Sequence, residues 1–278
     1  MSSTRPREFQ FTDEDFESIR KLMLERTGIS LGRAKQPMVY SRLARRLREL
    51  GMDSFRAYTE RLRQDVDGEF TELVAALSTN VTSFFREAHH FRYLRDEILP
   101  VLQARKRDPI RIWSAGCSTG EEPYSIAMTL CEALSPTELR QAHLLATDIS
   151  EAALDEARRA IYPMEEVRGL EREQLRRWFQ RGTGPHSGKV RVKSAIRDMV
   201  EFRSMNLFGE WAPNLRADVI FCRNTIIYFD REHKEALIKR FADTLEPRGY
   251  LVIGHSETLH GLSERFRLMG QTVYRKVD

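Results

Sequence analysis

The segment IRIWSAGCSTGEEPYS, residues 110–125, decides the fold class of this chain. It reads as a short apolar strand at 110–114, then a turn of small residues, then a helix over 122–134. The same order recurs downstream, with strands at 143–147, 219–222 and 249–254 and helices at 150–160 and 231–245. Strands that alternate with helices are typical of a parallel sheet covered by helices, so we predict an α/β domain.

The segment before it carries helical patterns only. Phe16, Ile19 and Met23 recur at the spacing of one helix face, and similar apolar stripes follow them. The alternation of strands with helices begins only after this region. We therefore predict an all-helical domain at residues 1–78 and the α/β domain at residues 79–278.

One section of the α/β domain departs from the alternation. The glycine-rich run RGTGPHSG, residues 181–188, is followed by two β-rich pieces at 189–193 and 199–202. Glycines favour tight turns between short strands. We predict a small antiparallel β-subdomain inserted at about residues 177–202.

The composition is that of a globular protein. Of the 278 residues, 41% are hydrophobic and 31% are charged, which excludes wholesale disorder. No apolar run approaches the ~18–20 residues of a membrane span, and residues 1–7 lack the apolar core of a secretory signal. The three cysteines are widely spaced and fit neither a disulfide framework nor a zinc site. We expect a soluble, cytoplasmic protein with reduced thiols.

The basic residues are unevenly distributed, although the net charge is only +4. Seven cations and no acid lie between Glu25 and Glu49: Arg26, Arg33, Lys35, Arg42, Arg45, Arg46 and Arg48. On the helix predicted here, Arg45 and Arg48 fall opposite the apolar stripe. Arg42 and Arg46 flank that stripe, so most of these arginines are expected at the surface. Such a block suits an acidic partner, either a phosphate backbone or a carboxylate-rich protein. The alternative interpretation is a helix face that is simply solvated.

Ligands of open α/β sheets bind outside the carboxyl ends of the strands. The loop at 114–123 has small residues there, but neither a dinucleotide-binding glycine pattern nor a P-loop. Glu121 and Glu122 would repel a pyrophosphate and suit a cationic or neutral group. Asp148 follows the second strand, where an acidic residue commonly accepts the ribose hydroxyls. Together they suggest a nucleoside without a pyrophosphate, such as S-adenosylmethionine, unless these residues only cap their helices.

Several longer motifs then resemble one family. They are NVTSFFREAHHF at 80–91, STGEEPYS at 118–125, ATDI at 146–149, FCRN at 221–224 with IYFD at 227–230, and GHSE at 254–257. In this order they are similar to the CheR family of chemotaxis-receptor glutamate O-methyltransferases, over nearly the whole chain. The resemblance implies a Rossmann-like, S-adenosylmethionine-dependent methyltransferase domain behind the helical one.

The resemblance also implies a set of cofactor contacts, namely Asn80, Thr82, Arg86, Glu122, Asp148, Asn206, Leu207, Arg223 and Asn224. Asp148 would bind the ribose, and Asn206 with Leu207 would lie beside the adenine. Arg86 would pair with the carboxylate of the cofactor or of the substrate. Tyr228 either lines the methyl-transfer pocket or is a core tyrosine. We interpret His89 and His90 as structural, since adjacent residues on a helix face different directions, and expect no metal.

The implied reaction moves a methyl group from S-adenosylmethionine to receptor glutamates and leaves S-adenosylhomocysteine. A glutamate with a pKa of ~4.3 is already ionised at pH 7, so no general base is needed. The implied partners are acidic receptor helices at Arg42, Arg45, Arg46 and Arg48, and a receptor C-terminal peptide at the glycines Gly182, Gly184 and Gly188. We expect a monomer.

Two other classes stay open at this point. A nucleic-acid methyltransferase could use the same fold and the arginine-rich helix. However, residues 223–225 read RNT, not the Asn/Asp-Pro-Pro-aromatic segment that stacks on a flipped base. A non-catalytic S-adenosylmethionine-binding regulator would be expected to have lost some cofactor contacts, and every implied position is filled.

Overall fold

The computed structural model describes residues 8–77, 82–105 and 109–278. Its contacts divide the chain into two compact units. One comprises Met1–Thr79 with the short segment Tyr228–Asp230, and the other comprises Asn80–Ile227 with Arg231–Asp278. We describe each unit by itself.

The first unit is helical. Its helices are α1 (Asp13–Thr27), α2 (Gln36–Leu50), α3 (Phe55–Gln64) and α4 (Glu69–Leu77), with 3-10 turns at Arg33–Lys35 and Val66–Gly68. Helix α1 begins at a capping box in which Asp15 N–H donates to Thr12 Oγ1 at 3.1 Å. It ends at Gly28, whose φ of 70° suits glycine. Apolar side chains from all four helices are buried between them.

The second unit is built on a seven-stranded mixed sheet with the order β6-β2-β1-β7-β8-β10-β9. Its strands are β1 (Arg111–Ala115), β2 (His143–Asp148), β6 (Val200–Ser204), β7 (Ala217–Cys222), β8 (Leu245–Ile253), β9 (Phe266–Gly270) and β10 (Val273–Lys276). The first five in the spatial order are parallel, and the C-terminal hairpin β9–β10 adds two antiparallel strands. The predicted fold class is confirmed.

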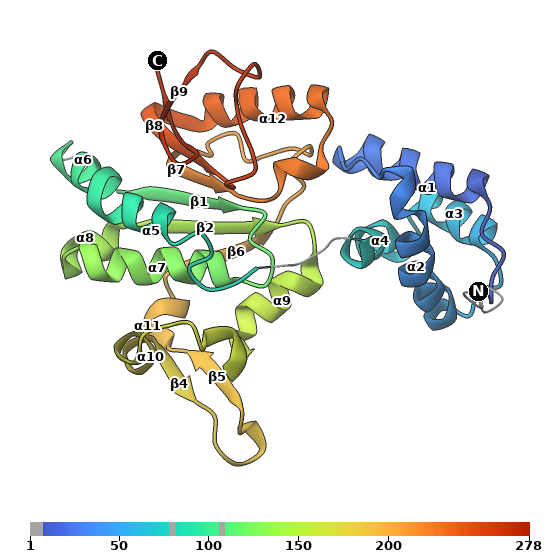
Figure 1. Ribbon diagram of the computed structural model, residues 1–278, viewed down its shortest axis with the longest axis horizontal. Coiled ribbons are helices and arrows are strands. Elements are labelled where there is room, and N and C mark those ends of the chain that lie inside the picture. Colours follow the sequence, from blue (N-terminus) through green and yellow to red (C-terminus); the bar gives the residue numbers. More distant parts are fainter. Residues whose placement is uncertain (1–7, 78–81, 106–108) are drawn as a thin grey trace, which may run out of the picture. The chain divides into compact units, whose positions relative to one another are not determined.

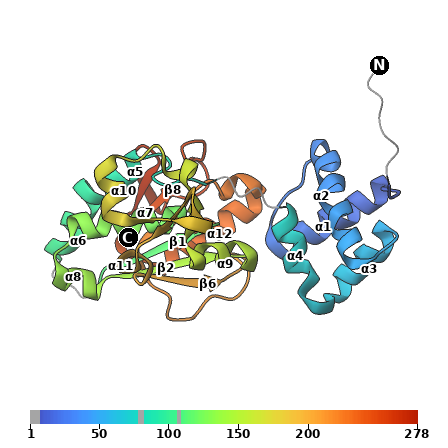
Figure 2. The ribbon, with the colours of Figure 1, turned by 90° about the horizontal axis from the view of Figure 1, so that it is seen from below.

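Helices cover both faces of this sheet (Figures 1 and 2). They are α5 (His89–Tyr93), α6 (Leu99–Ala104), α7 (Glu121–Ala133), α8 (Pro136–Gln141), α9 (Glu151–Arg159) and α12 (Arg231–Thr244), with a π turn at Leu94–Ile98 and a 3-10 turn at Ile226–Tyr228. Ile112 of β1 packs in the core with α5, α6 and α7. The next residue, Trp113, points to the opposite face, where its ring meets Phe241 of α12. No helix of the described residues is long and apolar enough to cross a membrane.

The inserted sheet differs from the prediction in its strands. It has the order β3-β5-β4, with β3 (Ile161–Pro163), β4 (Phe179–Arg181) and β5 (Lys189–Val192), and α10 (Arg172–Trp178), α11 (Ser194–Arg197) and 3-10 turns at Met164–Val167 and Gly184–His186 beside it. Of residues 199–202, predicted for this sheet, residues 200–202 lie instead in β6 of the main sheet, paired in parallel with β2. A β-rich run shows that a strand forms but not which sheet it joins. Figure 1 shows the β4–β5 hairpin extending away from the main sheet.

Candidate active site

The strand order brings the candidate residues to one edge of the main sheet. Because β6, β2, β1, β7 and β8 are parallel neighbours, their carboxyl ends meet there. The loops that follow them lie in the same order: 205–209, 149–150, 116–120, 223–225 and 254–257. Ligands of such sheets bind at this edge. These five loops therefore form the candidate ligand site.

The loop after β1 is drawn tightly against its neighbours. The backbone N–H groups of Gly116 and Cys117 both donate to the carbonyl of Thr147, at 2.8 and 2.9 Å. A Cβ on Gly116 would lie 2.5 Å from Thr225 Oγ1, so a larger residue would push the loop away. Ser118 Oγ is buried and has no hydrogen-bond partner among the described residues. A buried hydroxyl without a partner fits a site whose ligand completes it.

Asp148 lies at the end of β2, beside that loop. Its Oδ2 accepts a hydrogen bond from Ser118 N–H at 2.8 Å, and its Oδ1 accepts one from Ser150 N–H at 2.9 Å. Burial raises the pKa of this carboxyl, and the hydrogen bonds from Ser150 and Ser118 oppose the rise. Each oxygen of a carboxylate can accept more than one hydrogen bond, so the fixed group still has room for two hydroxyls.

Asn206 and Leu207 follow β6, next to Asp148, whose carbonyl accepts a hydrogen bond from Met205 N–H at 2.9 Å. Arg240 of α12 holds this loop through its carbonyl groups. Its guanidinium donates to Leu207 O at 2.6 Å and to Gly209 O at 2.7 Å. Sequence reasoning missed Arg240, because nothing near it in sequence shows that it reaches this loop.

Arg223, directly after β7, and Glu122, in the first turn of α7, form a buried ion pair. Arg223 Nη1 lies 3.0 Å from Glu122 Oε2, and Ser114 Oγ donates to Glu122 Oε1 at 2.8 Å. Arg223 Nη2 lies 3.3 Å from Glu87 and also donates to the carbonyl of Arg86. Burial raises the pKa of Glu122, and the charge of Arg223 opposes the rise. Two carboxylates therefore surround one guanidinium, an excess of negative charge that suits a cationic ligand.

Glu257 joins the loops after β7 and β8 through backbone groups. Its carboxylate accepts hydrogen bonds from the N–H groups of Gly254 at 2.6 Å, Asn224 at 3.0 Å and Ile227 at 3.1 Å. Asn224 has a φ of 56°, which non-glycine residues adopt only where the surroundings hold them. The position of Glu257 in the motif GHSE was the one sequence signal for it.

The remaining candidates are placed as follows. Thr82 and Arg86 are half-buried in the segment that leads to α5, whereas Asn80 lies outside the described residues. Tyr228 belongs to the segment that packs with the helical unit. Its carbonyl accepts a hydrogen bond from Ser30 N–H at 2.8 Å, and Lys35 Nζ lies 5.2 Å from its ring.

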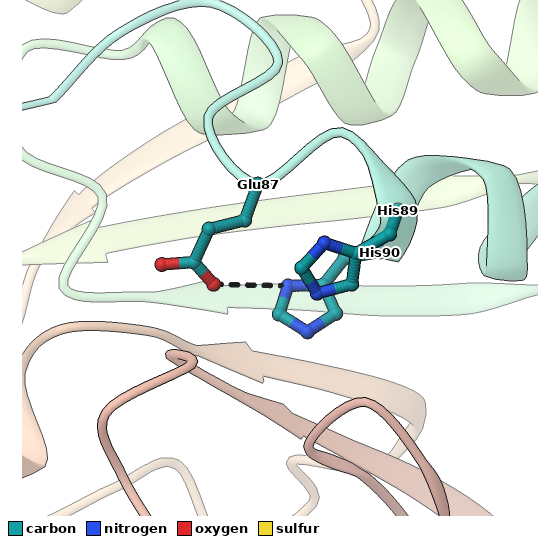
Figure 3. Close-up of side chains that lie close together, drawn as sticks. All are labelled: Glu87, His89 and His90. Carbon is teal, nitrogen blue, oxygen red and sulfur yellow. Dashed lines mark ion pairs between the residues drawn. The ribbon is translucent and has the colours of Figure 1, made fainter.

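Glu87, His89 and His90 bring together three side chains of types that bind metals, with ligand atoms within 4.8 Å of one another (Figure 3). The two histidine rings lie 4.1 Å apart, which corrects the expectation that they diverge. Both residues lie in the first turn of α5. Glu87, however, already faces the Arg223 guanidinium, which disfavours a second cation. Burial lowers the pKa of His90 to about 4, and its Nε2 lies 2.7 Å from the carbonyl of Gln271. We assign no metal to this cluster.

In the helical unit the arginines of α2 divide into two kinds. Arg46 forms a two-pronged ion pair with the buried Glu69, at 2.9 and 2.8 Å, and Arg42 donates to the carbonyl of Ala76 at 3.1 Å. These two are engaged within the unit rather than freely displayed, because the flank of the helix faces α4. The side chains of Arg45 and Arg48 are 80% and 57% exposed, as predicted.

The glycine-rich turn of the inserted sheet is a tight hairpin. A Cβ on Gly182 would lie 2.1 Å from the carbonyl oxygen of His186, and Gly184 and Gly188 have φ values of 55° and 82°. A cavity of about 250 Å³ lies at this hairpin; its lining includes Gly182, Arg181 and the exposed Ile161.

Comparison with known proteins gives two family matches. A family described as "CheR methyltransferase, SAM binding domain" matches residues 80–275, and "CheR methyltransferase, all-alpha domain" matches residues 14–78.

Individual relatives agree. The chain is 46% identical to chemotaxis protein methyltransferase 2 of Pseudomonas aeruginosa, over 96% of this chain and 94% of that protein. It is 45% identical to the chemotaxis protein methyltransferase of Escherichia coli, over 95% of this chain and 91% of that protein. Among solved structures, the DszA carbon methyltransferase aligns with 76% of this chain and 49% of its own, at 19% identity and a TM-score of 0.40. We draw nothing from so distant a likeness.

Proposed function

The chain belongs to the CheR family of methyltransferases, and from this premise we propose that it methylates glutamate side chains of chemotaxis receptors with S-adenosylmethionine. The observation that carries the proposal is the row of loops at the carboxyl edge. It combines a fixed carboxylate for a ribose, Asp148, with an excess of buried negative charge around Arg223. A cytoplasmic location and a monomeric state are further parts of the proposal and rest on the sequence alone.

The residues of this edge fit the cofactor in a definite order. Asp148, with Ser118 Oγ beside it, would hold the ribose hydroxyls. Asn206 and Leu207, on the loop held by Arg240, would flank the adenine. Glu122 would face the cationic end of the cofactor. The other proposed contacts are Asn80, Thr82, Arg86, Arg223 and Asn224.

The protein then has to orient two reactants and exclude water. S-adenosylmethionine supplies a methyl group on a positively charged sulfur. The receptor carboxylate is ionised at pH 7 and needs no base, so alignment and desolvation account for catalysis. We assign Arg86 to a carboxylate of the cofactor or the substrate. We assign Tyr228 to the wall of the transfer site.

The direct test is the destination of a labelled methyl group. Incubation with radiolabelled S-adenosylmethionine and receptor-rich membranes is expected to label receptor protein as base-labile esters. Parallel incubations contain DNA or RNA instead. Label in nucleic acid, or in neither substrate, would contradict the proposal.

The ribose assignment predicts the effect of Asp148→Ala. The variant loses two charge-assisted hydrogen bonds to the ligand, each worth ~1.5–3 kcal/mol, so affinity for S-adenosylhomocysteine is expected to fall at least about tenfold. Isothermal calorimetry measures this directly. Asp155→Ala on the exposed side of α9 is the matched control and should bind normally. An unchanged affinity of Asp148→Ala would place the ribose elsewhere.

We propose that the exposed arginines of α2 dock the acidic helices of the receptor. We predicted Arg42, Arg45, Arg46 and Arg48 for this role, and exposure now favours Arg45 and Arg48. Attraction between opposite charges speeds such encounters, and added salt screens this attraction.

The double variant Arg45→Glu, Arg48→Glu is therefore expected to slow receptor methylation about tenfold at low salt, and less at high salt. Initial rates against receptor concentration would show it as a loss of kcat/KM, with S-adenosylhomocysteine affinity unchanged. Arg56→Glu with Arg63→Glu, on α3, is the control of equal charge. Equal losses in both double variants would argue against a specific docking face.

We also propose that the inserted sheet holds the C-terminal peptide of a receptor. Its outer strands β3 and β4 are edges, and edges accept an extended peptide as an added strand. The cavity beside Gly182 offers the apolar side chain of Ile161 and the cations of Arg181, Lys189 and Arg191. These groups suit an aromatic side chain and an acidic or carboxylate end. Such a tether raises the local concentration of the enzyme near its substrate.

A further inference from the structure

We propose that Glu87 is a positioning residue for the cofactor site, whose carboxylate fixes the orientation of the Arg223 guanidinium and the Asn224 amide. The inference rests on the proposed function, since it takes Arg223 and Asn224 as cofactor contacts. Glu87 was not among the residues that the sequence motifs implied for this role.

The carboxylate of Glu87 joins three segments that are far apart in the sequence. Its Oε2 lies 3.3 Å from Arg223 Nη2, and its Oε1 accepts a hydrogen bond from Asn224 Nδ2 at 3.4 Å. From the loop after β8, His255 approaches with its backbone N–H at 3.1 Å and its ring Nδ1 at 2.8 Å. One side chain thus connects the segment before α5 with the loops after β7 and β8.

The fourth neighbour, His90, is drawn in Figure 3, where the dashed line joins its ring to Glu87. His90 Nδ1 lies 3.4 Å from Glu87 Oε2 and has no hydrogen-bond partner among the described residues. On its other side His90 is fixed to Gln271 and Thr272. The buried His90 ring is therefore fixed against the carboxylate of Glu87.

The backbone around Glu87 has an unusual conformation. Phe85 and Glu87 have φ values of 51° and 56°, a left-handed conformation that non-glycine residues adopt only at an energetic cost. Phe85 N–H donates to Ser125 Oγ of α7 at 2.9 Å, and the Glu87 carbonyl accepts from His90 N–H at 3.0 Å. These contacts hold the segment against α7. Strain of this kind concentrates at functional sites, which supports a role beyond packing.

Arg223 shows why a second carboxylate matters. A planar guanidinium held at one nitrogen can pivot about that contact, whereas contacts at both nitrogens fix its plane. Glu122 holds Nη1, and Glu87 with the Arg86 carbonyl holds Nη2. The Arg223 side chain is 1% exposed, so water cannot replace a lost partner.

Glu87 keeps its charge over the working pH range. Burial acts to raise its pKa, but the hydrogen bond from His255 and the charge of Arg223 outweigh burial and lower the pKa to about 2. The Glu87 carboxylate therefore presents a negative charge to Arg223, Asn224 and His255 at neutral pH.

The experiment measures the affinity of the full chain for S-adenosylhomocysteine by calorimetry, with thermal unfolding of each variant alongside. Glu87→Gln is expected to bind about tenfold more weakly and to raise the KM for S-adenosylmethionine, with the KM for receptor unchanged. His255→Ala removes a second contact from an exposed position, without disturbing the core, and is expected to weaken binding about threefold. Glu97→Gln, an exposed glutamate of the nearby turn, is the control and should bind normally.

The Asp148→Ala variant distinguishes a failure of the positioning role of Glu87 from a failure of the proposed cofactor site. If it loses affinity while Glu87→Gln and His255→Ala bind normally, the cofactor site stands and the positioning role is wrong. If Asp148→Ala also binds normally, the proposed cofactor site fails and takes this inference with it. Should Glu87→Gln fail to fold, His255→Ala decides: normal affinity overturns the positioning role, and weakened affinity supports it.

Discussion

Glu121→Gln is expected to raise the free energy of unfolding by about 3 kcal/mol at pH 8, whereas the same change at Glu122 is expected to weaken binding of S-adenosylhomocysteine. The two glutamates are consecutive and both are buried at the start of α7. Glu122 faces the buried Arg223 guanidinium, which Glu87 also faces. Glu122→Gln therefore removes the excess negative charge that suits the cationic end of the cofactor, while Arg223 keeps one carboxylate partner.

Glu121 has no guanidinium partner among the described residues. Its Oε2 accepts a hydrogen bond from Thr119 Oγ1 at 2.7 Å, but burial raises its pKa to about 7. From pH 4.5 to pH 7 the folded state keeps a proton that the unfolded chain loses, so stability falls as pH rises through this window. The loss amounts to about 3 kcal/mol at pH 8 and about half of that at pH 5.5.

Glutamine at position 121 is neutral at every pH, so the variant does not lose this stability as the pH rises. Urea unfolding of the wild type and Glu121→Gln at pH 5.5 and pH 8 measures the effect on stability, and calorimetry with S-adenosylhomocysteine measures the loss of affinity in Glu122→Gln. The gain in stability of Glu121→Gln over the wild type should shrink on acidification. A Glu121→Gln variant that is no more stable than the wild type at pH 8 would contradict the raised pKa.

The sequence predicted what depends on neighbours in the chain. Strand, small-residue loop and helix follow one another within 110–134, and an acidic residue ends the next strand, so the parallel sheet and the candidates Glu122 and Asp148 could be read directly. The inserted antiparallel sheet was predicted as well, but not that β3 belongs to it, because β3 has three residues and its partner β5 begins 26 positions after β3 ends.

Long-range partners explain the other omissions. Arg223 meets Glu122 across 101 positions of the chain, and Asn224 meets Glu87 across 137. Periodicity shows which face of a helix is apolar but not which charge lies opposite its flank. For that reason Arg46 was predicted at the edge of the docking face, although Glu69 of α4 holds it within the unit.

Gly182→Ala is expected to abolish binding of receptor tails while leaving the cofactor site intact. The added Cβ would lie 2.1 Å from the backbone oxygen of His186, a contact that no side-chain rotation relieves. The hairpin must therefore open, and with it the cavity that Gly182 lines and the register of β4 with β5. The main sheet lies outside this change, because the β4–β5 hairpin extends away from it (Figure 1).

The measurement is a titration with synthetic C-terminal peptides of receptors from the same organism. The wild type is expected to bind an aromatic-containing tail with a Kd on the order of micromolar, about −8 kcal/mol, and Gly182→Ala to show no binding. Gly169→Ala is the matched control in the same subdomain, since a Cβ there meets nothing within 4 Å. S-adenosylhomocysteine should bind equally to all three proteins. If no tail binds the wild type, the tether is absent, and the hairpin glycines serve only to turn the chain.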